Sequence, residues 1–119
     1  MSNQNIEGTY EYDFAGKKRK FKLDFLALSS IETRMGMPMM KIATNMTNIQ
    51  NIGVTNLAII LDEGLRCAGG KYTFQAVGDM ILKNGFAETI KIISELIPKS
   101  MGLEEGTDNP LEEEKNQEK

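Results

Sequence analysis

The sequence offers few side chains that could carry out nucleophilic, acid–base or metal chemistry. Its 119 residues include no His, no Trp and a single Cys, Cys67. These absences exclude Ser-His-Asp and Cys-His nucleophile systems, His-containing metal sites, paired-Cys sites and an internal disulfide. Asp62 and Glu63 are adjacent acids that could serve as a metal or acid–base pair. Neighbouring helical residues point about 100° apart, so we expect a solvated face rather than two converging carboxylates.

Cys67 and the glycines add no catalytic or cofactor site. The sequence shows no basic cluster that would lower the pKa of Cys67, so we expect it to be a small buried side chain. The glycines form neither GxGxxG nor GxxxxGK[ST] after a strand, and nothing supports a nucleotide site. We therefore expect a protein without enzyme activity, cofactor or metal. A carboxylate-dependent enzyme is an alternative, although no pair of acids has a spacing that indicates convergence.

A basic run covers Lys17–Lys22, with Tyr10 and Phe21 as aromatic neighbours. One interpretation is a nucleic-acid-binding module in which the cations hold phosphates and the aromatic rings stack on bases. The other is a hairpin whose lysines face an acidic strand, each opposed pair contributing about 0.2–1 kcal/mol. We favour the hairpin because only Lys17 and Arg19 lack an acidic neighbour, and the pI is near 5.0. The nucleic-acid-binding module is kept as the alternative function.

A methionine-rich run, Met35-Gly-Met-Pro-Met-Met, holds four of the eight methionines. Methionine can fill irregular gaps in a core, or it can form a surface that adapts to varied apolar partners. Helical spacing directs Met35 and Met39 inward and leaves Met37 and Met40 without a core position. We favour core filling, with partner binding as the alternative. The candidate partner-binding residues of the chain are Met37, Met39, Met40, Lys17 and Arg19.

The elements that position these residues begin with an antiparallel hairpin. In residues 6–14 the even positions are apolar or Gly and the odd ones acidic or Thr, and this parity reverses after Ala15-Gly16. A register in which paired residue numbers sum to 31, with Asp13 opposite Lys18, puts both apolar sets on one face. The parity restricts the loop to two or four residues.

The rest of the body has the periodicity of short helices. The expected helices run from a cap at Asp24 to Met35, from Pro38 to Gly53, from a cap at Thr55 to Ala68, from a cap at Thr73 to Lys83, and from Phe86 to a frayed end at Pro98. The expected inward residues are Phe25, Leu28, Ile31 and Met35 in the first helix, and Phe86, Ile90, Ile93 and Ile97 in the fifth. The fold class is α+β, an N-terminal antiparallel β-hairpin packed on about five short α-helices.

The charge divides the chain into two parts. Residues 103–119 contain seven acids and two lysines, a net charge of −5, whereas residues 1–102 contain 12 bases and 10 acids. The last stretch has too little apolar surface to offset its ordering entropy. We expect one hairpin-plus-helices domain over residues 1–102 and a disordered acidic tail over 103–119. With no signal peptide and no membrane span of roughly 18 apolar residues, the sequence indicates a cytosolic protein.

Two motifs within this order of elements are similar to those of a known family. The first is an apolar–polar pattern of the type xxFxLxxLxxIExxxG, compared with the 16 residues from Phe21 to Gly36, which follow the hairpin segment GTYEYDFAGKKRK. The second is LxxGLRxAG, from Leu61 to Gly69, which precedes YTFQAVGDMI and a terminal amphipathic helix. Over residues 8–101 the chain resembles the tail assembly chaperones of siphophages and gene transfer agents.

The resemblance implies a phage or prophage protein, encoded between the tail tube protein and the tape measure protein. It implies binding to the tape measure protein and assistance to tail tube assembly around it, without ATP, catalysis or a family catalytic residue. It places the protein in the bacterial cytoplasm and outside the mature virion, with neither nucleic acid nor a membrane as expected partner. The unpaired edge of the hairpin also suits pairing with another copy.

Overall fold

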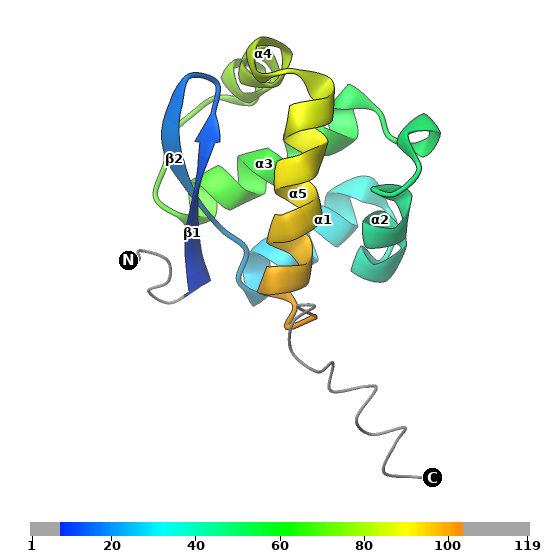
Figure 1. Cartoon of the computed structure of the whole chain (residues 1–119). Coiled ribbons are helices and arrows are strands. Elements are labelled where there is room, and N and C mark those ends of the chain that lie inside the picture. Colours follow the sequence, from blue (N-terminus) through cyan, green and yellow to red (C-terminus); the bar gives the residue numbers. More distant parts are fainter. Residues whose placement is uncertain (1–7, 104–119) are drawn as a thin grey trace, which may run out of the picture.

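A two-residue turn joins the two strands that open the fold (Figure 1). In the computed structural model, which describes residues 8–103, β1 (Thr9–Phe14) pairs antiparallel with β2 (Lys17–Lys22). Every pair has residue numbers that sum to 31, so the predicted register is confirmed. Ala15 and Gly16 have φ values of 55° and 94°, as a type I′ turn requires at both loop positions. Residues 6 and 7 of the predicted strand, and the predicted tail from residue 104 on, lie outside the described residues.

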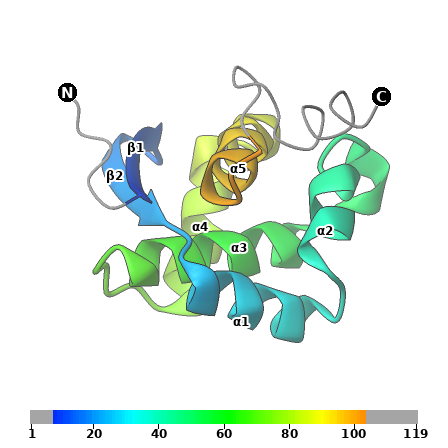
Figure 2. The ribbon, with the colours of Figure 1, turned by 90° about the horizontal axis from the view of Figure 1, so that it is seen from below.

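Five α-helices follow the hairpin, and the predicted α+β class is confirmed. They are α1 (Phe25–Met35), α2 (Met39–Asn45), α3 (Val54–Cys67), α4 (Phe74–Asn84) and α5 (Phe86–Ser100), with a 3₁₀ turn, η2 (Ile49–Asn51), before α3. Helix α3 lies in the middle and packs against β2, α1, α4 and α5 (Figures 1 and 2). No helix within residues 8–103 has the length and apolar character needed to cross a bilayer.

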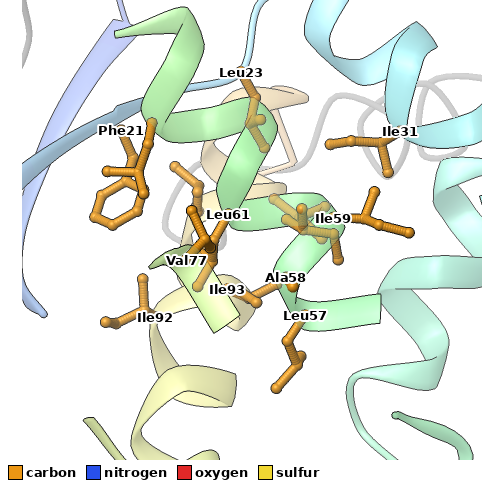
Figure 3. Close-up of a cluster of buried hydrophobic side chains, with 14 of the residues drawn as sticks. Phe21, Leu23, Ile31, Leu57, Ala58, Ile59, Leu61, Val77, Ile92 and Ile93 are labelled. Carbon is orange, nitrogen blue, oxygen red and sulfur yellow. The ribbon is translucent and has the colours of Figure 1, made fainter. Parts of the chain in front are cut away.

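The core is built around α3. All nine residues from Leu57 to Leu65 are buried, so the other elements cover this helix on every side. Figure 3 shows how side chains from α3, α4, α5, α1 and the hairpin meet there. The labelled core residues are Phe21, Leu23, Ile31, Leu57, Ala58, Ile59, Leu61, Val77, Ile92 and Ile93.

Side-chain caps start two of the helices at the predicted residues. The Asp24 carboxylate accepts a hydrogen bond from the Ala27 N–H at 2.9 Å and begins α1. The Thr73 hydroxyl accepts one from the Ala76 N–H at 3.0 Å and begins α4. Gly36, with φ of 68°, ends α1 in the left-handed conformation. These three predictions are confirmed.

Two other predicted boundaries are wrong. The second helix ends at Asn45 rather than Gly53, because the following residues turn tightly. The Thr47 N–H donates to the Thr44 carbonyl three residues back, and the Asn48 side chain accepts from the Gln50 N–H. Such local hydrogen bonds compete with an α-helix.

The third helix begins earlier than predicted, with its N-cap two residues before Thr55. Its first residue is Val54 and its N-cap is Gly53, so Thr55 is not the cap. The Asn56 amide oxygen accepts a hydrogen bond from the Gly53 N–H at 2.9 Å, which fixes the start of α3 at this point.

The end of α5 also differs from the prediction. The helix continues through Pro98 to Ser100, although Pro98 cannot donate to a carbonyl in the preceding turn. Leu96 and Ile97 are buried and hold the turn before the proline in the core. The Ile97 carbonyl then accepts from the Met101 N–H at 3.0 Å, which continues the helical pattern beyond it.

Two predicted helix faces are rotated in the structure. Phe25 was expected to face inward but is 77% exposed, because the Asp24 cap orients α1 with Ala27 and Ile31 toward the core. On α5, Phe86 and Ile90 are only partly buried. The fully buried set there is Thr89, Ile92, Ile93, Leu96 and Ile97.

The Asn84 side chain anchors the hairpin turn to the junction of α4 and α5. Its Oδ1 accepts a hydrogen bond from the Ala15 N–H at 3.0 Å. Its Nδ2 donates to the Thr89 Oγ1 at 3.1 Å, and this hydroxyl donates to the Gly85 carbonyl at 2.8 Å. Ala15 and Thr89 are both buried, so each needs a partner within the protein.

Replacing Asn84 should therefore destabilise the whole domain. For Asn84→Ala we expect a loss of about 1–3 kcal/mol in the free energy of unfolding, because the buried Ala15 N–H loses its acceptor and Thr89 loses one of its two partners. Urea unfolding followed by circular dichroism measures this loss. The control is Leu82→Ala, which removes a side chain that is 72% exposed on the same helix. Equal stability of the two variants would contradict the anchoring role.

Asp24 should give α1 a pH-dependent contribution. The hydrogen bond from the Ala27 N–H lowers the pKa of Asp24 below its usual value of 3.8, with burial acting in the opposite direction. A lowered folded-state pKa means that the contribution is present above about pH 4 and is lost as the pH falls through the folded pKa. We expect Asp24→Ala to lose about 1 kcal/mol at pH 7 in urea unfolding. The difference from the native sequence should narrow as the pH falls below 3.8, and a constant difference would contradict this assignment.

Candidate partner-binding surface

A groove between α2 and α5 is lined mainly by apolar side chains. We call it the methionine groove; its volume is about 140 Å³. The wall on the side of α2 and the turn after it consists of Ala43, Met46 and Thr47, and the α5 wall of Ile93, Ser94, Ile97 and Pro98. An apolar groove between two helices is a common seat for the apolar face of a partner helix.

Met40 lies on the same side of α2 as Ala43, although it does not itself line the groove. It precedes Ala43 by three residues, a spacing that places the two side chains on one side of the helix. The Met40 side chain is 55% exposed. Its flexible thioether can therefore adapt to the shape of an apolar partner.

The other two candidate methionines have different surroundings. Met37 is half-buried, and its sulfur accepts a hydrogen bond from the Asn45 side chain at 3.7 Å. Asn45 is five residues after Met40, so it lies on another side of α2. Met39 is only 3% exposed because it faces the core with Ile42. A partner at the surface can reach Met40 and Met37 but not the side chain of Met39.

A second groove lies between β2 and the loop from α3 to α4. We call it the basic groove; its volume is about 340 Å³. One side is lined by Lys17, Lys18, Arg19, Lys20 and Glu11, and the other includes Leu65, Gly70 and Tyr72. Four of the candidate cations of the sequence analysis are thus gathered along one depression.

The cations of the basic groove already have partners of several kinds. Arg19 donates to the Phe14 carbonyl at 2.8 Å and to the Tyr72 hydroxyl at 3.0 Å, with its guanidinium 5.6 Å from the centre of the Tyr72 ring. Lys18 forms an ion pair with Asp13 at 3.3 Å, as the hairpin interpretation predicted. Arg19 therefore fastens the hairpin to the loop before α4, while Lys17 and Lys20 are exposed.

The prediction that Asp62 and Glu63 form a solvated face is wrong. Their exposed fractions are 2% and 7%. One nitrogen of Arg34, from α1, donates to Asp62 at 3.0 Å and to Glu63 at 2.7 Å. Ser30 also donates to Glu63 at 2.6 Å, and Arg66 donates to Asp62 at 2.7 Å. The two acids point about 100° apart around α3, and the long Arg34 side chain of α1 reaches both of them. No local sequence pattern reveals this contact.

This buried charge cluster has the chemistry of a structural site. Burial acts to lower the pKa of Arg34, but hydrogen bonds and charge from Glu63 and Asp62 outweigh it and raise the pKa. The guanidinium also lies 5.5 Å from the centre of the Phe74 ring. Both carboxylates accept hydrogen bonds from cations. Within residues 8–103, no three Cys, Asp or Glu side chains are grouped to hold a metal ion.

Cys67 is half-buried rather than fully buried as expected. Burial raises the pKa of its thiol above the usual value of 9.0, against the opposing effect of a hydrogen bond with the backbone of Asp24. The thiol is therefore protonated at neutral pH and is a poor nucleophile.

A comparison with protein families places the chain among phage proteins. Residues 7–103 match the family described as "Phage tail tube protein, GTA-gp10", a family of phage tail assembly chaperones. The chain belongs to this family. Comparisons with curated proteins and with solved structures found no match.

Membership of the tail assembly chaperone family confirms the resemblance at the level of the family. The matched residues include both grooves and the buried charge cluster, and the match ends at residue 103. The residues that line the α5 wall of the methionine groove were not singled out from the sequence. Their helical stripe was recognised, but the α2 partner opposite it depends on packing between segments about 50 residues apart.

Arg34 is a second residue whose role the sequence did not reveal. A basic residue in the last turn of a helix is common because it complements the helix dipole. For Arg34→Met we expect a loss of about 2–4 kcal/mol in the free energy of unfolding, because Glu63 loses its cation while still buried. This loss is smaller than that for a fully buried ion pair because the Arg34 side chain is 31% exposed.

The control for this experiment is Arg66→Met. Its side chain is 60% exposed, and Asp62 keeps Arg34, so we expect a loss below about 1 kcal/mol. Adding Glu63→Gln to Arg34→Met should recover part of the lost stability by removing the unpaired charge. Equal losses in the free energy of unfolding for the two arginine variants would contradict the conclusion that Arg34 neutralises the buried charge cluster.

Proposed function

We propose that the protein is a tail assembly chaperone that binds the tape measure protein and promotes assembly of tail tube protein around it. Its membership of the tail assembly chaperone family supports this role. The observation that carries the proposal is the methionine groove, with the 55% exposed Met40 on the Ala43 side of α2. The groove offers an apolar, adaptable seat for a helix.

The proposed mechanism is reversible coverage of apolar surface. A long helical partner presents apolar stripes that aggregate before the tail tube encloses them. A stripe seated between α2 and α5 is removed from water, and each well-buried apolar side chain contributes about 1.5–3 kcal/mol. Such binding needs neither ATP nor a covalent step, and tail tube subunits can displace the chaperone by covering the same stripe.

The same proposal places the protein in the bacterial host cytoplasm during assembly and outside the mature virion. Residues 1–102 form the assembly domain, and residues 103–119 are a separate acidic segment with a net charge of −5. The hairpin is a two-stranded sheet, so each strand pairs on one side only within the described residues. Its outer edges are where a second copy would add a strand.

Charge introduced beside the groove should weaken binding to the tape measure protein without unfolding the domain. For Met40→Glu we expect at least about a tenfold loss of affinity, since a carboxylate must be desolvated against an apolar helix. Met37→Glu, in the connection just before α2, should also weaken binding. Binding is measured by pull-down and titration with the tape measure protein, and stability by a circular dichroism melt.

The matched control is Leu82→Glu, which charges a 72% exposed apolar residue on α4. This variant should bind the tape measure protein as the native chain does. If Leu82→Glu and Met40→Glu weaken binding equally, the groove is not the binding site. A large fall in melting temperature for Met37→Glu or Met40→Glu would instead assign that residue to the core.

A further inference from the structure

The basic groove has an excess of positive charge that the fold does not neutralise. Its lining includes Lys17, Lys18, Arg19 and Lys20 against the single acid Glu11. The ion pair of Lys18 with Asp13 joins side chains that are 67% and 80% exposed, so it is screened by water and weak. The groove therefore attracts a polyanion.

The groove is also held in shape. Arg19 donates to carbonyls at the hairpin turn and to the Tyr72 hydroxyl, which links its two sides. On the opposite side, a Cβ added to Gly70 would lie 2.9 Å from the Tyr72 ring and 3.0 Å from the Leu65 carbonyl. This close approach of backbone and ring leaves room for glycine only, so the wall beside Tyr72 is tightly packed.

The chain carries a polyanion of matching charge. Residues 104–119 contain seven acids and two lysines, a net charge of −5, whereas the described residues 8–103 contain 12 bases and 9 acids. We propose that this acidic segment binds the basic groove of its own domain. The proposal concerns a different surface from the methionine groove and does not depend on the proposed function.

The position of the end of α5 makes the intramolecular contact feasible. Lys99 lies 5.3 Å from the centre of the Tyr10 ring and 5.7 Å from that of Tyr12, so this end of α5 is beside β1 (Figure 1). From there to the hairpin turn is about 20 Å, the length of a six-residue strand. Sixteen residues reach up to about 55 Å when extended, which is ample.

Because the acidic segment is tethered to the domain, it is favoured in the basic groove over a polyanion that is free in solution. A segment attached at this distance has an effective concentration in the millimolar range at the groove. A nucleic acid would have to displace it, and both would compete for the same lysines. The acidic segment therefore acts as a built-in competitor that keeps polyanions out of the basic groove.

The test uses the full chain and compares amide chemical shifts in ¹⁵N-labelled protein. A variant with all seven acids of residues 104–119 changed to Gln or Asn should shift the amides of residues 17–20 and 69–72. In 1 M salt, where the Debye length is about 3 Å, the native chain should show the shifts of that variant. Unchanged groove amides at low salt would overturn the proposal.

Two substitutions in the groove test its location. Lys17→Gln with Lys20→Gln should abolish the difference between the native and neutralised segments, whereas Lys41→Gln with Lys91→Gln should preserve it. Lys41 and Lys91 are exposed lysines on α2 and α5. An equal effect of the two pairs would show general attraction rather than a site, and would overturn the proposal.

A dilution series and a competition experiment distinguish the acidic segment of the same chain from a second copy and from a nucleic acid. Shifts that persist from about 20 μM to 1 mM support contact within one chain, and shifts that disappear on dilution would assign the contact to a second copy instead. A single-stranded DNA 20-mer should bind the neutralised variant at least about tenfold more tightly than the native chain at low salt. Equal DNA affinity of the two chains would contradict competition by the segment.

Discussion

The rest of the structure depends on the burial of the middle of α3, Leu57–Leu65, which includes two adjacent carboxylates. A helix covered on all sides normally has apolar residues at every position, yet Asp62 and Glu63 are among its nine buried residues. Arg34 reaches from α1 and donates to both of them, and Arg66 and Ser30 each donate to one, so the buried carboxylates are compensated. This pairing fixes α1 against α3 in one register, since a shifted helix would leave both acids without their shared cation. The position of α1 along α3 is therefore set by charge as well as by apolar packing.

The position of the methionine groove follows from this register. Helix α2 is joined to α1 by three residues, Gly36, Met37 and Pro38, so the end of α1 determines where α2 begins. The Glu32 carboxylate of α1 accepts a hydrogen bond from the Met39 N–H at 2.7 Å and ties the two helices together. Helix α5 is placed independently, by its own contacts with α3 and α4. The space between α2 and α5 is what these two placements leave open.

Features set by neighbouring residues were predictable from the sequence, and features set by distant ones were not. The hairpin register follows from parity on either side of Ala15-Gly16, and the caps at Asp24 and Thr73 follow from local hydrogen bonding. The candidate methionines were found by composition, but their distribution between core and surface depends on the rotation of α2. The partners of Arg34 and Asn84 lie on other elements, which is why neither residue was recognised. The predicted cap at Thr55 was wrong because the side chain of its neighbour Asn56 bonds to the Gly53 N–H and determines the start of the helix.

The two walls of the methionine groove differ in how firmly they are held, and this difference suits a chaperone. Helix α5 has 15 residues with five buried side chains, whereas α2 has seven residues with two. The N-cap residue of α2, Pro38, makes no side-chain capping hydrogen bond, and a 3₁₀ turn follows the helix. A short helix with few buried contacts opens locally at a lower free energy than a long one. The α2 wall can therefore adjust its distance from a rigid α5, and a groove with one adjustable wall accepts apolar segments of different width along a long partner.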